Sequence, residues 1–288
     1  MPLINYSKLF LDLAKPFAQK PSHLINNIIW RFPQNVSTKE HIFIIGAPRS
    51  GTTLLESILS VHPNFTSIEI ETGIFTFRDI YTFTNATRNM EERQSIELIL
   101  KDSKDIIDFY DRFTTFFLMK EGGKFFLEKT PQHILHLGFI KRYFPNARFI
   151  NIYRDGRDCY CSARNNEWVI QGNNIERYAK YWRKCVLARL QEKNQLNILD
   201  VKYENLTSEP ESTIKEIMSF LKEEYSPKQL NPQYYSQHKA SKAKEFNKLS
   251  KPIDNSSQKR WIKELTNDEI STFNKIAGRE LLKLGYPL

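Results

Sequence analysis

A short buried strand that runs through a glycine-framed turn into a helix is the feature that most constrains the fold of this chain. Residues 42–45 (IFII) are β-branched or aromatic, as in a strand that is covered on both faces. The turn 46–51 (GAPRSG) follows, and residues 52–61 then repeat apolar side chains at helical spacing. A buried strand that leads directly into a helix is typical of α/β proteins, so the segment predicts a parallel sheet.

Strand and helix patterns alternate along the rest of the chain. Further strands are expected at 125–127 (FFL), 148–153 (RFINIY) and 198–203 (ILDVKY). Helices are expected between them, and a capping box at 266–269 (TNDE) begins a last helix near the C-terminus. We therefore predict one α/β domain over 1–288, with a central parallel sheet flanked by helices in three layers. We also expect an N-terminal helical extension (1–39) and a helical insertion (85–120).

Composition narrows the class of protein. The 288 residues include 42 Lys and Arg against 33 Asp and Glu, a net charge of +9 that favours an anionic ligand. With 40% hydrophobic residues the chain is too apolar for disorder, and no apolar run is long enough to cross a membrane. The three cysteines cannot all pair, and Lys8 and Asp12 interrupt any signal-peptide core. We therefore expect a cytoplasmic location.

The turn 46–51 has the G-x-x-x-x-G skeleton of a phosphate-binding P-loop, which makes the predicted fold P-loop-like. Its glycines let backbone N–H groups point inward, and the start of the helix adds about half a positive charge. Thr52 replaces the lysine of nucleotide hydrolases, while Arg49 supplies a cation with a planar fork suited to oxyanions. The loop therefore favours a short anion chain over a triphosphate.

A second anion site is expected where the strand 148–153 ends in RDGRDCYCS and turns into a helix. The carboxyl ends of parallel strands meet at one edge of the sheet, so Arg154 would lie near the first loop and bind a second phosphate of one ligand. Ser162 lies eight residues further on, in the first turns of the helix. The neighbouring Arg157 is expected instead to form a surface ion pair with Asp155 or Asp158.

The two segments IFIIGAPRSGTTLLESILSVHP and IYRDGRDCYCSARN resemble the 5′- and 3′-phosphate signatures of sulfotransferases that use 3′-phosphoadenosine 5′-phosphosulfate (PAPS). They are most similar to the tyrosylprotein-sulfotransferase-like branch and its bacterial relatives. The likeness covers roughly residues 40–288, because 128–131 (EKTP), 201–206 (VKYENL) and 251–261 follow in order. The resemblance implies transfer of a sulfuryl group from PAPS to an acceptor hydroxyl, phenol or amine, which leaves adenosine 3′,5′-bisphosphate.

The resemblance also implies roles for individual residues. The first loop would hold the 5′-phosphosulfate, Arg154 and Ser162 the 3′-phosphate, and the tail cation Lys259 or Arg260 would close over the donor. Tyr203 would contact the adenine or the nearby backbone, unless it is a core tyrosine with a satisfied hydroxyl. The implied donor set is Arg49, Ser50, Gly51, Thr52, Thr53, Arg154, Ser162, Tyr203 and Arg260.

The catalytic residues implied by the resemblance are a lysine and a glutamate. Lys129 would stabilise charge on the bridging oxygen, and a glutamate after His62 would be the general base. Glu69 and Glu71 face the same side of an expected strand, so alternation cannot separate them, but Thr72 after Glu71 favours Glu71. His62 itself is expected to be structural. The P–O–S anhydride is a good leaving group, so we expect no metal.

Two other functions fit parts of the sequence. A nucleotide or small-molecule kinase with a degenerate P-loop is opposed by Thr52, and a nucleic-acid module is suggested only by the lysine-rich loop 237–259. The acceptor, whether small molecule, carbohydrate or peptide, is not readable, and a homodimer is kept as an option. The aromatic residues of the insertion would line an acceptor pocket or, as we expect, a helical core stripe: Phe109, Tyr110, Phe113, Phe116 and Phe117.

Overall fold

Strand β1 (Ile42–Gly46) is the centre of the fold, and all of its residues are buried. It pairs in parallel with β3 (Phe125–Lys129) on one side and with β4 (Arg148–Tyr153) on the other. The edge strands β2 (Phe65–Thr66) and β5 (Ile198–Lys202) complete a five-stranded sheet in the order β2-β3-β1-β4-β5. The predicted parallel sheet is therefore confirmed.

The structure is a computed structural model that describes residue 30 and residues 32–76, 89–166, 169–192, 197–237 and 249–288. Most of the expected N-terminal extension (1–39) lies outside these residues, as does most of the lysine-rich part of the loop 237–259. Over the described ranges, no helix is both long and apolar enough to cross a membrane.

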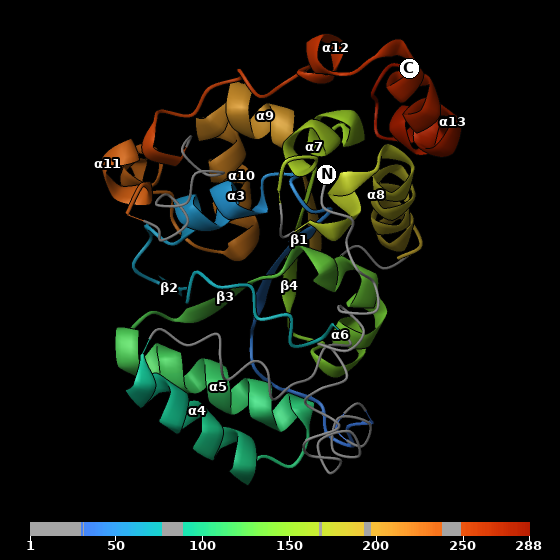
Figure 1. Ribbon diagram of the computed structural model, residues 1–288. Coiled ribbons are helices and arrows are strands. Elements are labelled where there is room, and N and C mark those ends of the chain that lie inside the picture. Colours follow the sequence, from blue (N-terminus) through green and yellow to red (C-terminus); the bar gives the residue numbers. More distant parts are fainter. Residues whose placement is uncertain (1–29, 31, 77–88, 167–168, 193–196, 238–248) are drawn as a thin grey trace.

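Side chains of β1 point alternately into two hydrophobic cores, one on each face of the sheet. Helices cover both faces, so the fold has three layers (Figure 1). Ile42 and Ile44 pack with one set of helices, and Phe43 and Ile45 pack with the other. The first set is α3 (Thr52–Leu59), α9 (Tyr203–Ser208) and α10 (Pro210–Leu221). The second is α5 (Ile106–Glu121), α7 (Gly156–Ala163), α8 (Ile175–Leu190) and α13 (Asn267–Lys283).

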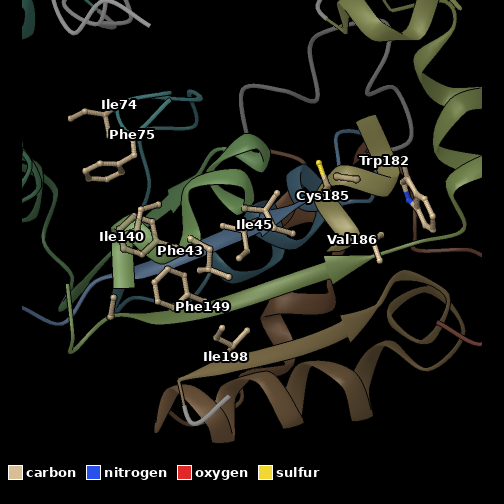
Figure 2. Close-up of a cluster of buried hydrophobic side chains, with 14 of the residues drawn as sticks. Phe43, Ile45, Ile74, Phe75, Ile140, Phe149, Trp182, Cys185, Val186 and Ile198 are labelled. Atoms are coloured by element: carbon tan, nitrogen blue, oxygen red, sulfur yellow. The ribbon is translucent and has the colours of Figure 1, made fainter. Parts of the chain in front are cut away.

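Figure 2 shows part of the second core, where Phe43 and Phe149 of the sheet lie in the same cluster as Trp182 of α8. The aromatic stripe of α5 belongs to this cluster too, with Phe109, Tyr110, Phe113 and Phe117 buried and Phe116 partly buried. The expectation of a core stripe is therefore correct. The remaining elements are α4 (Met90–Asp102), α6 (Leu137–Tyr143), α11 (Pro232–Tyr235), α12 (Trp261–Glu264) and the 3-10 turns η2 (Pro131–His136), η3 (Ile170–Asn173) and η4 (Pro227–Leu230).

Two expected strands have different ends in the structure. β2 stops at Thr66, so the expectation that Glu69 and Glu71 alternate along a strand is wrong. Glu69 has a φ of 60°, which an extended strand does not allow, and its amide donates to the hydroxyl of Ser67. At the other edge, β5 ends at Lys202 and Tyr203 begins α9.

A close approach between Gly51 and Tyr203 fixes the start of α3 against α9. Gly51 has a left-handed φ of 108°, and a Cβ placed on it would lie 2.5 Å from the Tyr203 ring. Only glycine satisfies both conditions.

We expect Gly51→Ala to lower the free energy of unfolding by more than the strain of its φ alone, which costs about 1–3 kcal/mol. The matched control is Gly285→Ala, because Gly285 has a φ of 77° and open space around its Cβ position. Urea unfolding of both variants measures the difference. Equal losses of stability would show that the contact with Tyr203 is not tight.

Candidate active site

The loop between β1 and α3 places buried polar groups at the start of a helix. No side chain caps the N-terminus of α3, which begins after the left-handed Gly51. The hydroxyl of Ser50 is fully buried and has no hydrogen-bond partner among the described residues. Thr52 and Thr53 are also buried in the first turn of α3. An uncapped helix start beside an unsatisfied buried hydroxyl suits a bound anion.

The second bend, at the end of β4, lies directly against this loop. Arg154 donates from one terminal nitrogen to the backbone carbonyl of Arg49 at 3.2 Å. The Nε of Arg49 in turn donates to the hydroxyl of Ser162 at 3.0 Å. The guanidinium of Arg154 lies 4.4 Å from the centre of the Tyr203 ring, and its Nε is buried with no hydrogen-bond partner in the described part of the chain. The structure therefore brings these four predicted residues together.

Residues 249–261, called the tail segment below, cover this bend. The backbone carbonyl of Ser257 accepts a hydrogen bond from Arg154. The carboxylate of Asp158 accepts hydrogen bonds from the backbone amides of Lys259 at 2.8 Å and Trp261 at 3.0 Å. Burial raises the pKa of Asp158, although Arg154 and these amides act in the opposite direction. Asp158 thus holds the tail segment through its main chain.

The neighbouring Arg157 differs from the expectation of a surface ion pair. It does pair with Asp155, at 2.8 Å, but its side chain is completely buried. The guanidinium also lies 3.7 Å from the centre of the Trp261 ring. A terminal nitrogen of Arg157 also donates to the backbone carbonyl of Pro287 at 2.6 Å, so the tail segment and the C-terminal residues together cover this arginine.

In the described part of the chain, no hydrogen bond or ion pair joins Arg260 to the two bends. Its Nε donates to Glu264 at 2.7 Å, four residues further along the chain. Arg164 of the α7 end binds the same carboxylate at 3.2 Å. The role of Arg260 in donor binding therefore stays a prediction.

Lys129, the last residue of β3, is buried and forms a charge cluster with the buried Glu56 and the partly exposed Glu71. Its Nζ donates to Glu71 at 2.9 Å and lies 3.7 Å from a carboxylate oxygen of Glu56. Burial alone would lower the pKa of Lys129, but the negative charges of Glu71 and Glu56 outweigh burial and raise the pKa. The lysine therefore stays positively charged. Of the two candidate bases, Glu71 rather than Glu69 forms an ion pair with Lys129 in the described part of the chain.

The register of the sheet places this cluster beside the anion loop. Lys129 is aligned with Ile44 of β1, two residues before Gly46 begins the loop. Glu56 lies one helical turn after Thr52 and Thr53 on α3. The cation at the end of β3 is thus next to the anion loop at the end of β1.

Sequence reasoning missed one residue of the charge cluster, Glu56, although an acidic residue within the apolar pattern of 54–59 is a signal of a buried partner.

Two further expectations concern His62 and a metal ion. His62 is structural as expected, since its Nδ1 accepts from the amide of Asn64 and its ring lies 5.2 Å from that of Phe65. Within the described ranges, no group of three or more His, Cys, Asp and Glu side chains is arranged to hold a metal ion.

Solved structures of several sulfotransferases have a similar fold. The sulfotransferase domain of the Synechococcus PCC 7002 olefin synthase aligns with a TM-score of 0.61 at 20% identity, over 86% of this chain and 98% of that domain. A mouse sulfotransferase complexed with PAP aligns with a TM-score of 0.53 at 17% identity, over 86% of each chain. At these identities the likeness concerns the fold, and it confirms the expected P-loop-like α/β class.

Sequence comparison shows the family. Protein-tyrosine sulfotransferase 2 of Gallus gallus is 26% identical over 281 residues, which cover 91% of this chain and 72% of that relative. Protein-tyrosine sulfotransferase A of Caenorhabditis elegans is 24% identical over 86% of this chain and 68% of its own length. The profile of the sulfotransferase family matches residues 41–227. With more than half of its length matched, the chain belongs to the sulfotransferase family, as the two anion loops led us to expect.

Proposed function

We propose that this sulfotransferase moves a sulfuryl group from PAPS to an acceptor hydroxyl, with Glu71 as general base and Lys129 as the stabilising cation. The observation that carries the proposal is the 2.9 Å contact between Lys129 and Glu71 at the strand end next to the anion loop. At this distance the base can accept the proton of the acceptor oxygen while the cation stabilises the departing oxygen of the donor.

The residues around the two bends fit a donor with two separate anionic ends. Arg49, buried Ser50 and the uncapped start of α3 offer donors for the 5′-phosphosulfate. Within the described ranges the buried Nε of Arg154 has no hydrogen-bond partner, and Ser162 lies within hydrogen-bond distance of Arg49, which supports a 3′-phosphate at the second bend. Tyr203 presents its ring to Arg154 and supports the neighbouring nucleoside.

The chain's own side chains then account for the movements of charge and proton. PAPS supplies a sulfuryl group on a P–O–S anhydride, a bond that breaks without covalent help from the protein. Glu71 accepts the proton of the acceptor hydroxyl as its oxygen bonds to sulfur. Lys129 neutralises the negative charge that develops on the departing phosphate oxygen, and it can do so because nearby carboxylates keep it protonated.

Glu71 is also accessible to a large acceptor. Its side chain is 45% exposed, whereas that of Lys129 is 6% exposed. An exposed base suits a peptide, and two relatives are protein-tyrosine sulfotransferases, so we propose a tyrosine in a peptide as the acceptor. The test measures transfer of labelled sulfate to tyrosine peptides, matched phenylalanine peptides, carbohydrates and small alcohols. We expect transfer only to the tyrosine peptides.

The cytoplasmic location, the homodimer and the single-domain boundaries stay predictions.

We expect the protein to bind adenosine 3′,5′-bisphosphate at least about tenfold more tightly than AMP, because a second phosphate adds charge-assisted hydrogen bonds. Arg154→Lys should remove most of this preference, since it keeps the charge but loses the planar fork. Arg164→Lys is the control, because Arg164 binds Glu264 instead. Isothermal titration measures the three proteins. Equal affinity of the unmodified protein for AMP and the bisphosphate would contradict a second phosphate site.

We expect Glu71→Gln to reduce kcat by about 10²–10⁴-fold, the usual contribution of a general base, while bisphosphate affinity is unchanged. Glu69→Gln is the matched control, two residues earlier, and should keep nearly full activity. Initial rates with labelled PAPS measure both variants. Full activity of Glu71→Gln, or an equal loss in both variants, would exclude Glu71 as the specific base.

A further inference from the structure

The backbone that follows Glu71 is held by side chains rather than by a strand or helix. The consecutive amides of Gly73, Ile74 and Phe75 donate hydrogen bonds to three side-chain acceptors. These acceptors are the hydroxyl of Thr130 at 3.1 Å, the hydroxyl of Thr72 at 3.3 Å and Nε2 of His133 at 3.3 Å. Two of the three come from the end of β3 and the turn after it, so the segment is fixed to the sheet.

Glu128 connects the two threonines. Both hydroxyls donate to the same carboxyl oxygen of Glu128 at 2.7 Å. A hydroxyl has one proton, so each threonine that accepts an amide and donates to Glu128 has a defined orientation. Glu128 is buried, and its carboxyl oxygen lies 3.7 Å from Nδ1 of His133. Thr72, Glu128, Thr130 and His133 are called the Glu128 cluster below.

Alternation along β3 gives the Glu128 cluster its place in the site. Successive side chains of a strand point to opposite faces, so Lys129 lies with Glu56 of α3 and Glu128 lies on the other face. Glu71 is thus attached to β3 by its side chain through Lys129, and the next residue, Thr72, is attached through Glu128. The same segment is held from both faces of one strand.

We propose that Glu128 is a positioning residue of the active site, which fixes the segment 71–75 through Thr72 and Thr130 so that the Glu71 carboxylate is directed at Lys129. This inference rests on the proposed function of Glu71 as base. Glu128 does not touch the reacting atoms, and its effect reaches the reaction through the orientation of Glu71.

The charge state of Glu128 gives the positioning a pH dependence. Burial raises the pKa of Glu128 to about 8, although the two threonine hydroxyls lower it, while Glu56 raises it and Lys129 lowers it. Tyr110 of α5 is neutral because burial raises its pKa, and His133 is neutral because burial lowers its pKa to about 3. Because the folded pKa of about 8 lies above the ordinary value of 4.5, the free energy of unfolding falls as pH rises from about 4.5 to about 8 and then levels off, while the charge of Glu128 itself changes near pH 8.

The first test removes a hydroxyl at constant size. Thr72→Val should lower kcat by about 10- to 100-fold, as expected for a misplaced catalytic group, with bisphosphate affinity unchanged. Thr72→Ser restores the hydroxyl and should restore kcat. Thr76→Val is the control, because the Thr76 hydroxyl donates to the carbonyl of Gly73 in the same segment but not to Glu128.

The second test uses the charge of Glu128. Glu128→Gln keeps a neutral oxygen acceptor, so it should retain kcat at pH 7. It should lack the fall of kcat that the unmodified protein shows as pH rises through about 8, and the fall of melting temperature that the unmodified protein shows between about pH 4.5 and 8. Glu71→Gln, measured alongside, tests the base itself.

The outcomes separate the two proposals. If Glu71→Gln is inactive while Thr72→Val keeps full kcat, or if Thr72→Ser fails to restore it, the positioning role is overturned and the proposed base stands. The positioning role is also overturned if the kcat of Glu128→Gln falls as pH rises through about 8 in the same way as the kcat of the unmodified protein. If Glu71→Gln is active, the proposed function fails, and the positioning role fails with it.

Discussion

The buried positive charge of Lys129 is the constraint around which the site is arranged. A buried ammonium group requires nearby negative charge, because otherwise it loses its proton or destabilises the fold. Glu56 supplies part of that charge from α3 and Glu71 supplies the rest from the segment after β2. The ion pair that keeps the lysine charged therefore also holds the proposed base at the end of β3, beside the anion loop.

Sheet order explains why residues distant in sequence meet here. β1 lies between β3 and β4, so the loop after β1 has Lys129 on one side and Arg154 on the other. In a parallel sheet all three positions lie at carboxyl ends of strands and share one edge. The arrangement separates two tasks: the β1–β4 side offers donors for two anionic groups, and the β1–β3 side offers a cation and a base.

The sequence predicted the parts of the site that depend on local chemistry. Glycine spacing, the strand that precedes it and the arginine at the end of β4 are readable over a few residues, and both bends lie side by side as expected. Strand alternation could not separate Glu69 from Glu71, and only the following Thr72 favoured Glu71, because their difference is a contact with a lysine 58 residues away from Glu71. The sequence analysis also placed Glu69 and Glu71 on a strand, whereas the φ of Glu69 turns the chain there. The burial of Arg157 depends on contacts with Trp261 and with the carbonyl of Pro287, which no local pattern reveals.

The attachment of the tail segment has an evolutionary consequence. Asp158 and Arg154 contact it through the amides of Lys259 and Trp261 and the carbonyl of Ser257, groups that every ordinary amino acid except proline provides. Substitutions at Ser257 and Lys259 therefore leave these anchoring bonds intact, as long as the backbone keeps its path. Related proteins can diversify these side chains while retaining the same cover, so low similarity in this region does not imply a different architecture.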